Sequence, residues 1–264
     1  MSYSSDKKHK LIFENWRRFL KEENEPATAA NVAAKADTDT LVKSLMNLDL
    51  SSFIQQVSVK PYQSAILSGL AQYDGDPDDD KFQVEEVTII CRKLRPTQNE
   101  VVMSKSLEFP LEHPKDFIRY RAGGTFKVGP PGNNAIITFG GKYVVDGHHR
   151  WSALYCCNPN AKITAWNITK PGIRPDDVLK VAQAAIYSIS KKIPSAKGGG
   201  INLFATNEGT VRKYIHGVIA RSPALIEIYS KYLSKEKALV KEGPMDLALV
   251  VAGLANIIWP NIEV

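Results

Sequence analysis

The sequence predicts an α+β fold, in which a small mixed sheet carries one central helix and further helices precede and follow it. Short β-branched runs separated by glycines occupy the middle of the chain, whereas apolar residues at helical spacing fill both ends. At 264 residues the chain can form one large domain or two small ones. The composition, 44% hydrophobic and 23% charged, is ordinary for a globular protein.

The expected strands lie between residues 84 and 168. Alternating or β-branched runs predict strands at 84–91, 125–128, 135–139, 142–145 and 163–168. Gly140 and Gly141 suit the two-residue type I′ turn of a hairpin. Between the first two strands, Pro110 and Pro114 are expected to interrupt any regular helix. These features describe a domain over residues 38–170.

Amphipathic patterns predict helices before the first strand, two of them inside this domain, and further helices after the last strand. Residues 1–37 comprise a helix at 10–23 and a polar linker, and this helix is expected to dock on a protein partner or on the chain's own core. Residues 171–264 form a helical C-terminal region. The other helices are expected at 38–56, 60–73, 175–192, 208–220, 223–236 and 244–258. The break at 195–200 is either a phosphate-cradling loop or a loop that closes over a ligand.

Charge and cysteine content restrict the partners and the compartment. A net charge of +6 and a pI near 9.0 favour polyanionic partners such as nucleotides or nucleic acid. Three cysteines without metal-ligand spacing and without a recognisable signal peptide predict a reducing, cytoplasmic setting. The longest apolar run, 247–259, is too short to cross a bilayer, so no membrane partner is expected.

The most informative motif is Asp146-Gly147-His148-His149-Arg150, which follows a predicted strand and opens a predicted helix. The first turn of a helix exposes unpaired N–H groups and partial positive charge, which attract anions. Gly147 permits close approach of a ligand, and the Arg150 guanidinium can grip phosphate oxygens with two donors. Since consecutive helical residues are about 100° apart, only one of the two histidines can reach the ligand together with Arg150. The motif therefore predicts a phosphate site.

This region also resembles a known family. The run from Val144 to Ala153 resembles the Gly-x-x-Arg box of the ParB/sulfiredoxin superfamily, and Leu94-Arg95-Pro96-Thr97-Gln98 resembles its Leu-x-Pro turn. The resemblance covers about residues 85–168 and implies that the loop and helix start cradle nucleotide phosphates. Sulfiredoxins carry their reactive cysteine where this chain has His148, so peroxiredoxin repair is not expected. Residues 10–23 resemble short N-terminal segments of marine bacteriophage proteins, which implies a docking tag and, for a phage protein, the host cytoplasm.

Serine kinases of this superfamily use an acidic residue beside the Leu-x-Pro turn as the base. Here Gln98 occupies the closest position, and Glu100 lies two residues further on. The first hypothesis is an enzyme that hydrolyses ATP or a related nucleoside triphosphate, or transfers its phosphate, with Mg²⁺. The expected catalytic residues are His148, His149, Asp146 and Glu100, the expected phosphate-binding or nucleotide-binding residues are Gly147, His149, Arg150, Thr97, Gln98 and Lys105, and the expected metal ligand is Asp146.

Two other functions remain open at this point. One is a DNA-binding ParB-like protein or nuclease, although the basic residues of the C-terminal helices do not form a clear recognition helix. The other is a non-enzymatic scaffold that docks through its N-terminal helix. Nucleotide binding separates the first hypothesis from the scaffold, and a steep salt dependence of DNA affinity would indicate contacts to the DNA backbone.

Overall fold

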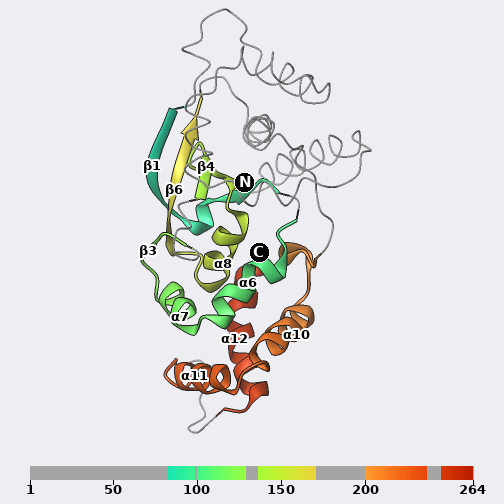
Figure 1. Ribbon diagram of the computed structural model, residues 1–264. Coiled ribbons are helices and arrows are strands. Elements are labelled where there is room, and N and C mark those ends of the chain that lie inside the picture. The colour runs from blue at the N-terminus through green and yellow to red at the C-terminus, as the bar shows by residue number, and fades with distance from the viewer. Residues whose placement is uncertain (1–82, 99, 129–135, 171–199, 237–244, 264) are drawn as a thin grey trace, which may run out of the picture.

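The computed structural model describes residues 83–98, 100–128, 136–170, 200–236 and 245–263 (Figure 1). Its strands are β1 (Gln83–Ile90), β2 (Arg95–Pro96), β3 (Thr125–Phe126), β4 (Ile136–Phe139), β5 (Tyr143–Asp146) and β6 (Lys162–Thr169). Its α-helices are α6 (Met103–Glu112), α7 (Pro114–Ala122), α8 (His148–Cys157), α10 (Glu208–Ile219), α11 (Pro223–Leu233) and α12 (Leu247–Ile262). Two short 3-10 helices are η1 (Cys91–Lys93) and η2 (Leu203–Ala205). The described residues therefore form an α+β fold, as the sequence predicts.

Some predicted segments lie outside the described residues. They are the helices at 10–23, 38–56, 60–73 and 175–192, the N-terminal linker, and most of the glycine-rich break at 195–200.

The sheet is mixed, with strand order β1-β6-β4-β5-β2, and β3 pairs with β6 outside this path. β6 is antiparallel to β1 and parallel to both β3 and β4, whereas β4 and β5 form the antiparallel hairpin. Both loop glycines have positive φ, 56° at Gly140 and 63° at Gly141, and the Lys142 N–H donates to the Phe139 carbonyl at 3.1 Å. The two positive φ values agree with the predicted type I′ turn. The strand register pairs Phe139 with Tyr143, however, so the loop also contains Lys142 and is one residue longer than predicted.

Helix α6 departs from the predicted interruption at Pro110, because Pro110 lies inside it. The proline ring is buried, and the Tyr229 hydroxyl donates to the carbonyls of Pro110 and Leu111 at 3.0 and 3.1 Å. Packing of the buried residue offsets the backbone bond that Pro110 cannot donate, and Tyr229 supplies a donor to carbonyls of the last turn, where Pro114 has no N–H. Helix α6 ends at Glu112, and His113 separates it from α7. Pro114 begins α7 at the first helical position, which favours proline.

One hydrophobic core joins the sheet to the C-terminal helices. Helix α8 lies on β4 and β5, while α6 and α12 pack against α8 (Figure 1). The core includes fully buried Leu107 of α6, Leu154 of α8, Val211 of α10 and Leu254 of α12. The helices after residue 200 are thus part of the same packed unit as the described sheet.

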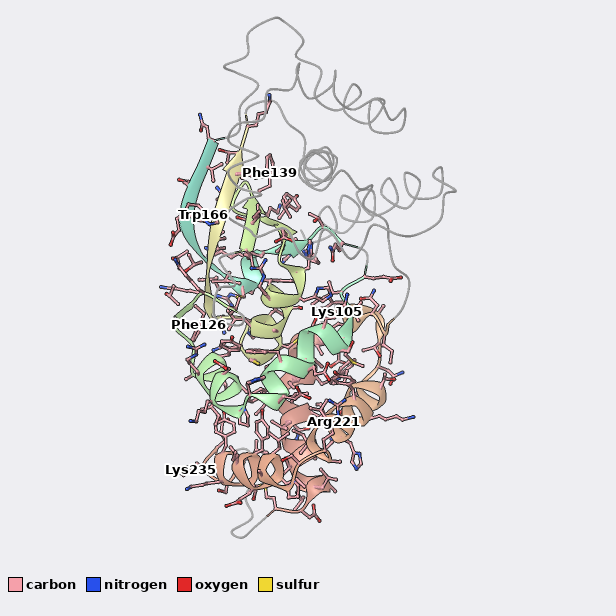
Figure 2. The ribbon with its side chains drawn as sticks, viewed as in Figure 1. Lys105, Phe126, Phe139, Trp166, Arg221 and Lys235 are labelled. Atoms are coloured by element: carbon pink, nitrogen blue, oxygen red, sulfur yellow. The ribbon has the colours of Figure 1, made fainter. Side chains whose placement is uncertain are left out.

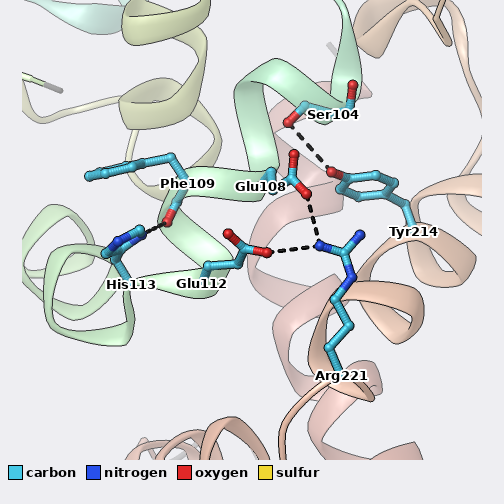
Figure 3. Close-up of polar contacts among 7 residues, drawn as sticks. All are labelled: Ser104, Glu108, Phe109, Glu112, His113, Tyr214 and Arg221. Atoms are coloured by element: carbon cyan, nitrogen blue, oxygen red, sulfur yellow. Dashed lines mark hydrogen bonds and ion pairs between the residues drawn. The ribbon is translucent and has the colours of Figure 1, made fainter. Parts of the chain in front are cut away.

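Polar contacts on the surface join α6 to α10 and to the turn that follows α10. The Arg221 guanidinium donates to Glu108 and Glu112 of α6, at 2.8 Å in each case (Figure 3). The Tyr214 hydroxyl of α10 donates to the Ser104 carbonyl at 3.4 Å. Among the described residues, none of the helices has both the length and the apolar character needed to cross a membrane.

Candidate functional site

Helix α8 starts directly after β5, through a sharp turn at Gly147. This residue has φ 85° and ψ 27°, in the left-handed region that favours glycine. A Cβ here would lie 2.5 Å from Ile136 Cγ2 and 3.0 Å from Arg150 Nη2. Close packing within the chain therefore requires glycine at this position, independently of any ligand.

The first turn of α8 has neither a side-chain N-cap hydrogen bond nor an acidic residue. It instead carries His148, His149 and Arg150, where the helix dipole disfavours positive charge. A ligand anion at this end would interact favourably with both the amides and the nearby cation. How the three side chains are held decides which of them can meet such an anion.

His148 points into the protein and is only 2% exposed. Its Nε2 accepts a hydrogen bond from the Thr97 N–H at 3.1 Å, and the Thr97 hydroxyl donates to the Val144 carbonyl at 2.5 Å. Burial and the neighbouring His149 lower the pKa of His148 to about 3. Neutral His148 and buried Thr97 thus tie the Leu-x-Pro turn to β5 and α8, rather than facing a ligand.

His149 is partly exposed and lies beside the start of α6. Its Nε2 accepts a hydrogen bond from the Val102 N–H at 3.3 Å. Partial burial and the charge of Lys105 lower the pKa of His149 to about 4. Lys105 is exposed near the N-terminal end of α6 (Figure 2). The fold therefore brings a lysine of one helix near a neutral histidine of another.

Arg150 lies across the turn and pairs with Asp146, with Nη2 and Oδ2 2.9 Å apart. The arginine side chain is 15% exposed and the aspartate side chain 33%. Burial raises the pKa of the Asp146 carboxyl, while the Arg150 guanidinium and the Gly147 N–H oppose this shift. The pair holds the guanidinium close to the first turn of α8.

The remaining residues predicted for the site make no described contact with the start of α8. Gln98 and Glu100 are exposed in the segment between β2 and α6, and no hydrogen bond among the described residues joins either side chain to α8. No group of three potential metal ligands occurs among the described residues. One carboxylate, that of Asp146, is sufficient for Mg²⁺ only when phosphate oxygens and water molecules supply most of the other ligands.

One side of α8 faces the hydrophobic core. Trp151 and Leu154 are 2% and 0% exposed. The thiols of Cys156 and Cys157 are free and buried, and burial raises the pKa of both well above the usual range. These cysteines therefore pack in the core.

Two polar features near the site were not predicted from the sequence. The Ser152 hydroxyl donates to Ser106 Oγ at 2.8 Å and joins α8 to α6 inside the core. Asn202, which precedes η2, forms a β-bridge with Val102, the residue that binds His149. The bridge joins residues 100 positions apart in the chain, and no local pattern signals such a contact.

Comparison of the chain with known protein families, with curated proteins and with solved structures finds no match. The resemblance to the ParB/sulfiredoxin superfamily therefore stays a prediction based on the two motifs.

Proposed function

We propose that the protein binds a nucleoside triphosphate at the start of α8 and hydrolyses it or transfers its terminal phosphate, within a ParB/sulfiredoxin-like domain. The observation that carries this proposal is a helix start without a side-chain N-cap hydrogen bond, whose first turn carries His149 and Arg150, with Lys105 of α6 near His149. Phosphoryl transfer depends mainly on positioning and on stabilising negative charge, and this arrangement supports both requirements.

The roles differ from those expected from the sequence. His148 and Thr97 are assigned to the framework, because both are buried and hydrogen bond to each other. Lys105 and Arg150 are assigned to the phosphates. Glu100, which is exposed before α6, keeps the role of base for the acceptor or water that the superfamily resemblance implies.

A magnesium ion would enter with the nucleotide. Asp146 is the residue that would contact it, directly or through water, because its carboxylate lies at the same turn as Arg150. When bound, the ion would supply charge stabilisation on the phosphate oxygens. The residues of the chain would keep their own tasks: the α8 amides and Arg150 bind the phosphates, and the buried His148 keeps the turn in place.

The described contacts do not favour DNA binding as a second function. Arg212 pairs with Glu208, and Arg221 pairs with Glu108 and Glu112. These acidic partners reduce the positive potential that the C-terminal helices could offer to a DNA backbone. DNA binding therefore enters the experiments only as an alternative outcome.

The test measures ATP, CTP and GTP binding calorimetrically, with Mg²⁺, and then measures nucleoside diphosphate release. Arg150→Ala is expected to weaken binding by about tenfold or more, equivalent to about 1.4 kcal/mol or more. Glu100→Gln is expected to keep binding and to lose turnover. The matched control is Arg212→Ala, because Arg212 forms a similar pair with the residue four positions before it, on α10.

If Arg150→Ala and Arg212→Ala bind every nucleotide as the wild type does, the site is elsewhere. If the wild type binds none of the three nucleotides, the proposed function is wrong, and the scaffold and DNA alternatives take its place.

A further inference from the structure

The segment around Asn202 reaches the proposed phosphate site from the C-terminal half of the chain. The Met103 N–H donates to the Ile201 carbonyl, and the Leu203 N–H donates to the Val101 carbonyl, both at 2.8 Å. These two bonds form the antiparallel bridge between Val102 and Asn202. We call residues 200–203 the strap, because they hold the backbone of 101–103 at the start of α6.

Asn202 adds a side-chain contact to this bridge. Its Oδ1 accepts hydrogen bonds from the N–H groups of Val101 at 3.2 Å and Phe204 at 3.3 Å. One oxygen thus fixes both the residue before Val102 and the first turn of η2. Gly200 allows this close approach, since a Cβ there would lie 2.6 Å from Val102 Cγ1.

The strap acts on His149 through the Val102 N–H. A backbone N–H can only donate, so His149 Nε2 accepts the bond at 3.3 Å, and the neutral ring carries its proton on Nδ1. The position of Val102 therefore sets both the orientation of the imidazole and its tautomer. In this form His149 offers a ligand an N–H donor rather than a base.

We infer that Asn202 is a positioning residue, which holds His149 through Val102 as a fixed Nδ1–H donor for a phosphate oxygen. The phosphate as the ligand of His149 rests on the proposed function. The orientation of His149 by Asn202 and Val102 does not depend on that function. It assigns the C-terminal helices a part in the site, because the strap leads directly into η2 and α10. A neutral donor suits a helix start that already carries Arg150 and lies near Lys105, since a further positive charge would be repelled.

The test uses three variants of the full chain. Asn202→Ala removes the acceptor oxygen, and Asn202→Asp keeps one at the same place. Asn207→Ala is the matched control: Asn207 lies five residues further on, and its side chain accepts the Thr210 N–H at 2.9 Å as the N-cap of α10, so this change also removes an asparagine acceptor from the C-terminal half. Thermal unfolding and circular dichroism establish that each variant is folded.

The first readout is the ¹⁵N spectrum of the His149 imidazole without ligand, assigned with His149→Gln. The wild type, Asn202→Asp and Asn207→Ala are expected to show the Nδ1–H tautomer. Asn202→Ala is expected to show a mixture of tautomers. An unchanged tautomer in a folded Asn202→Ala variant would overturn the inference.

The second readout is nucleotide affinity at pH 7. Asn202→Ala is expected to weaken it by about tenfold, comparable to what removing the outer partner of a ligand-holding histidine costs. Asn202→Asp is expected to restore most of this loss, and Asn207→Ala to bind as the wild type does. If Asn202→Ala binds nucleotide as tightly as the wild type, the inference is overturned. If the wild type binds no nucleotide, the proposed function is overturned instead, and the tautomer of His149 alone decides whether Asn202 positions it.

Discussion

Helices α8 and α10 begin in opposite ways, although each has an arginine paired with an acidic residue four positions earlier. At α10, Asn207 caps the Thr210 N–H and Glu208 lies in the first turn, so the chain itself stabilises the exposed amides. At α8, Gly147 has no side chain to act as a cap, and the first turn contains Arg150 and two neutral histidines instead of an acidic residue. The difference indicates that Asn207 caps α10 directly, whereas the acidic group at the start of α8 is Asp146, which is paired with Arg150. In our proposal an anion from outside the chain binds beside this pair.

The largest expected difference between the two helices is the change in stability when a glycine at each is replaced by alanine. Gly147→Ala should destabilise the protein by roughly 3 kcal/mol, because the left-handed backbone and the contact with Ile136 both exclude a methyl group. Gly217→Ala, within α10 and with no neighbour within 4 Å of its Cβ position, should stabilise it by about 0.5–1 kcal/mol. Urea denaturation measures both changes. A tolerated Gly147→Ala substitution would contradict the described packing of the turn.

A pH series tests the different roles of the two α8 histidines. Both are held neutral, with pKa values of about 3 for His148 and about 4 for His149. As pH falls below about 6.5, the unfolded chain takes up protons that the folded chain does not, so stability is lost toward acid and levels off near the folded pKa values. Between pH 7 and pH 5 the His148 contribution to this loss should be about 2 kcal/mol.

His148→Gln keeps an acceptor for the Thr97 N–H but cannot be protonated in this range. The variant should therefore lose about 2 kcal/mol less than the wild type between pH 7 and pH 5, as measured by urea midpoints at each pH. Equal losses in the two proteins would show that His148 is not buried in its neutral form.

Much of the fold was predictable because it follows from local patterns. The β4–β5 hairpin depends on Gly140-Gly141, and strand β6 on a β-branched run. Pro110 was misleading, because the buried contacts of its ring and of Tyr229 with α6 are not visible in a local pattern. Local propensity is overridden where tertiary packing compensates for a missing hydrogen bond.

The candidate site was predictable only in its position along the chain. The motif located the helix start, Arg150 and Gly147, but not the direction of each histidine. That direction depends on Thr97 for His148 and on Val102 for His149, contacts between residues about 50 positions apart. Such partners are selected by the packing of α6 and β2 around α8, so the sequence could not separate the framework histidine from the exposed one.

Ligand-induced stabilisation is expected at α8 and not at α10. A nucleotide at ten times its Kd should stabilise the wild type by about 1.4 kcal/mol, seen as a rise in Tm of several degrees. The same rise is expected in Arg212→Ala, and a much smaller one in Arg150→Ala. An equal rise in both arginine variants would place the ligand away from α8.

The smallest predicted effect concerns the cap of α10. Asn207→Ala should destabilise the protein by about 1 kcal/mol, because the Thr210 N–H loses its acceptor. The nucleotide-induced rise in Tm should be unchanged in this variant. Thermal unfolding with and without nucleotide measures both quantities, and loss of the rise would contradict the assignment of α10 to a purely structural role.

The most direct measurement of the central proposal is the backbone ¹H–¹⁵N spectrum of the full chain during titration with ATP and, in parallel, with inorganic pyrophosphate. We expect the largest shifts at the amides of His148, His149 and Arg150, for both ligands, and little change at residues 208–210 of α10. Shifts centred on α10, or none at the start of α8 with either ligand, would contradict the placement of phosphates on α8.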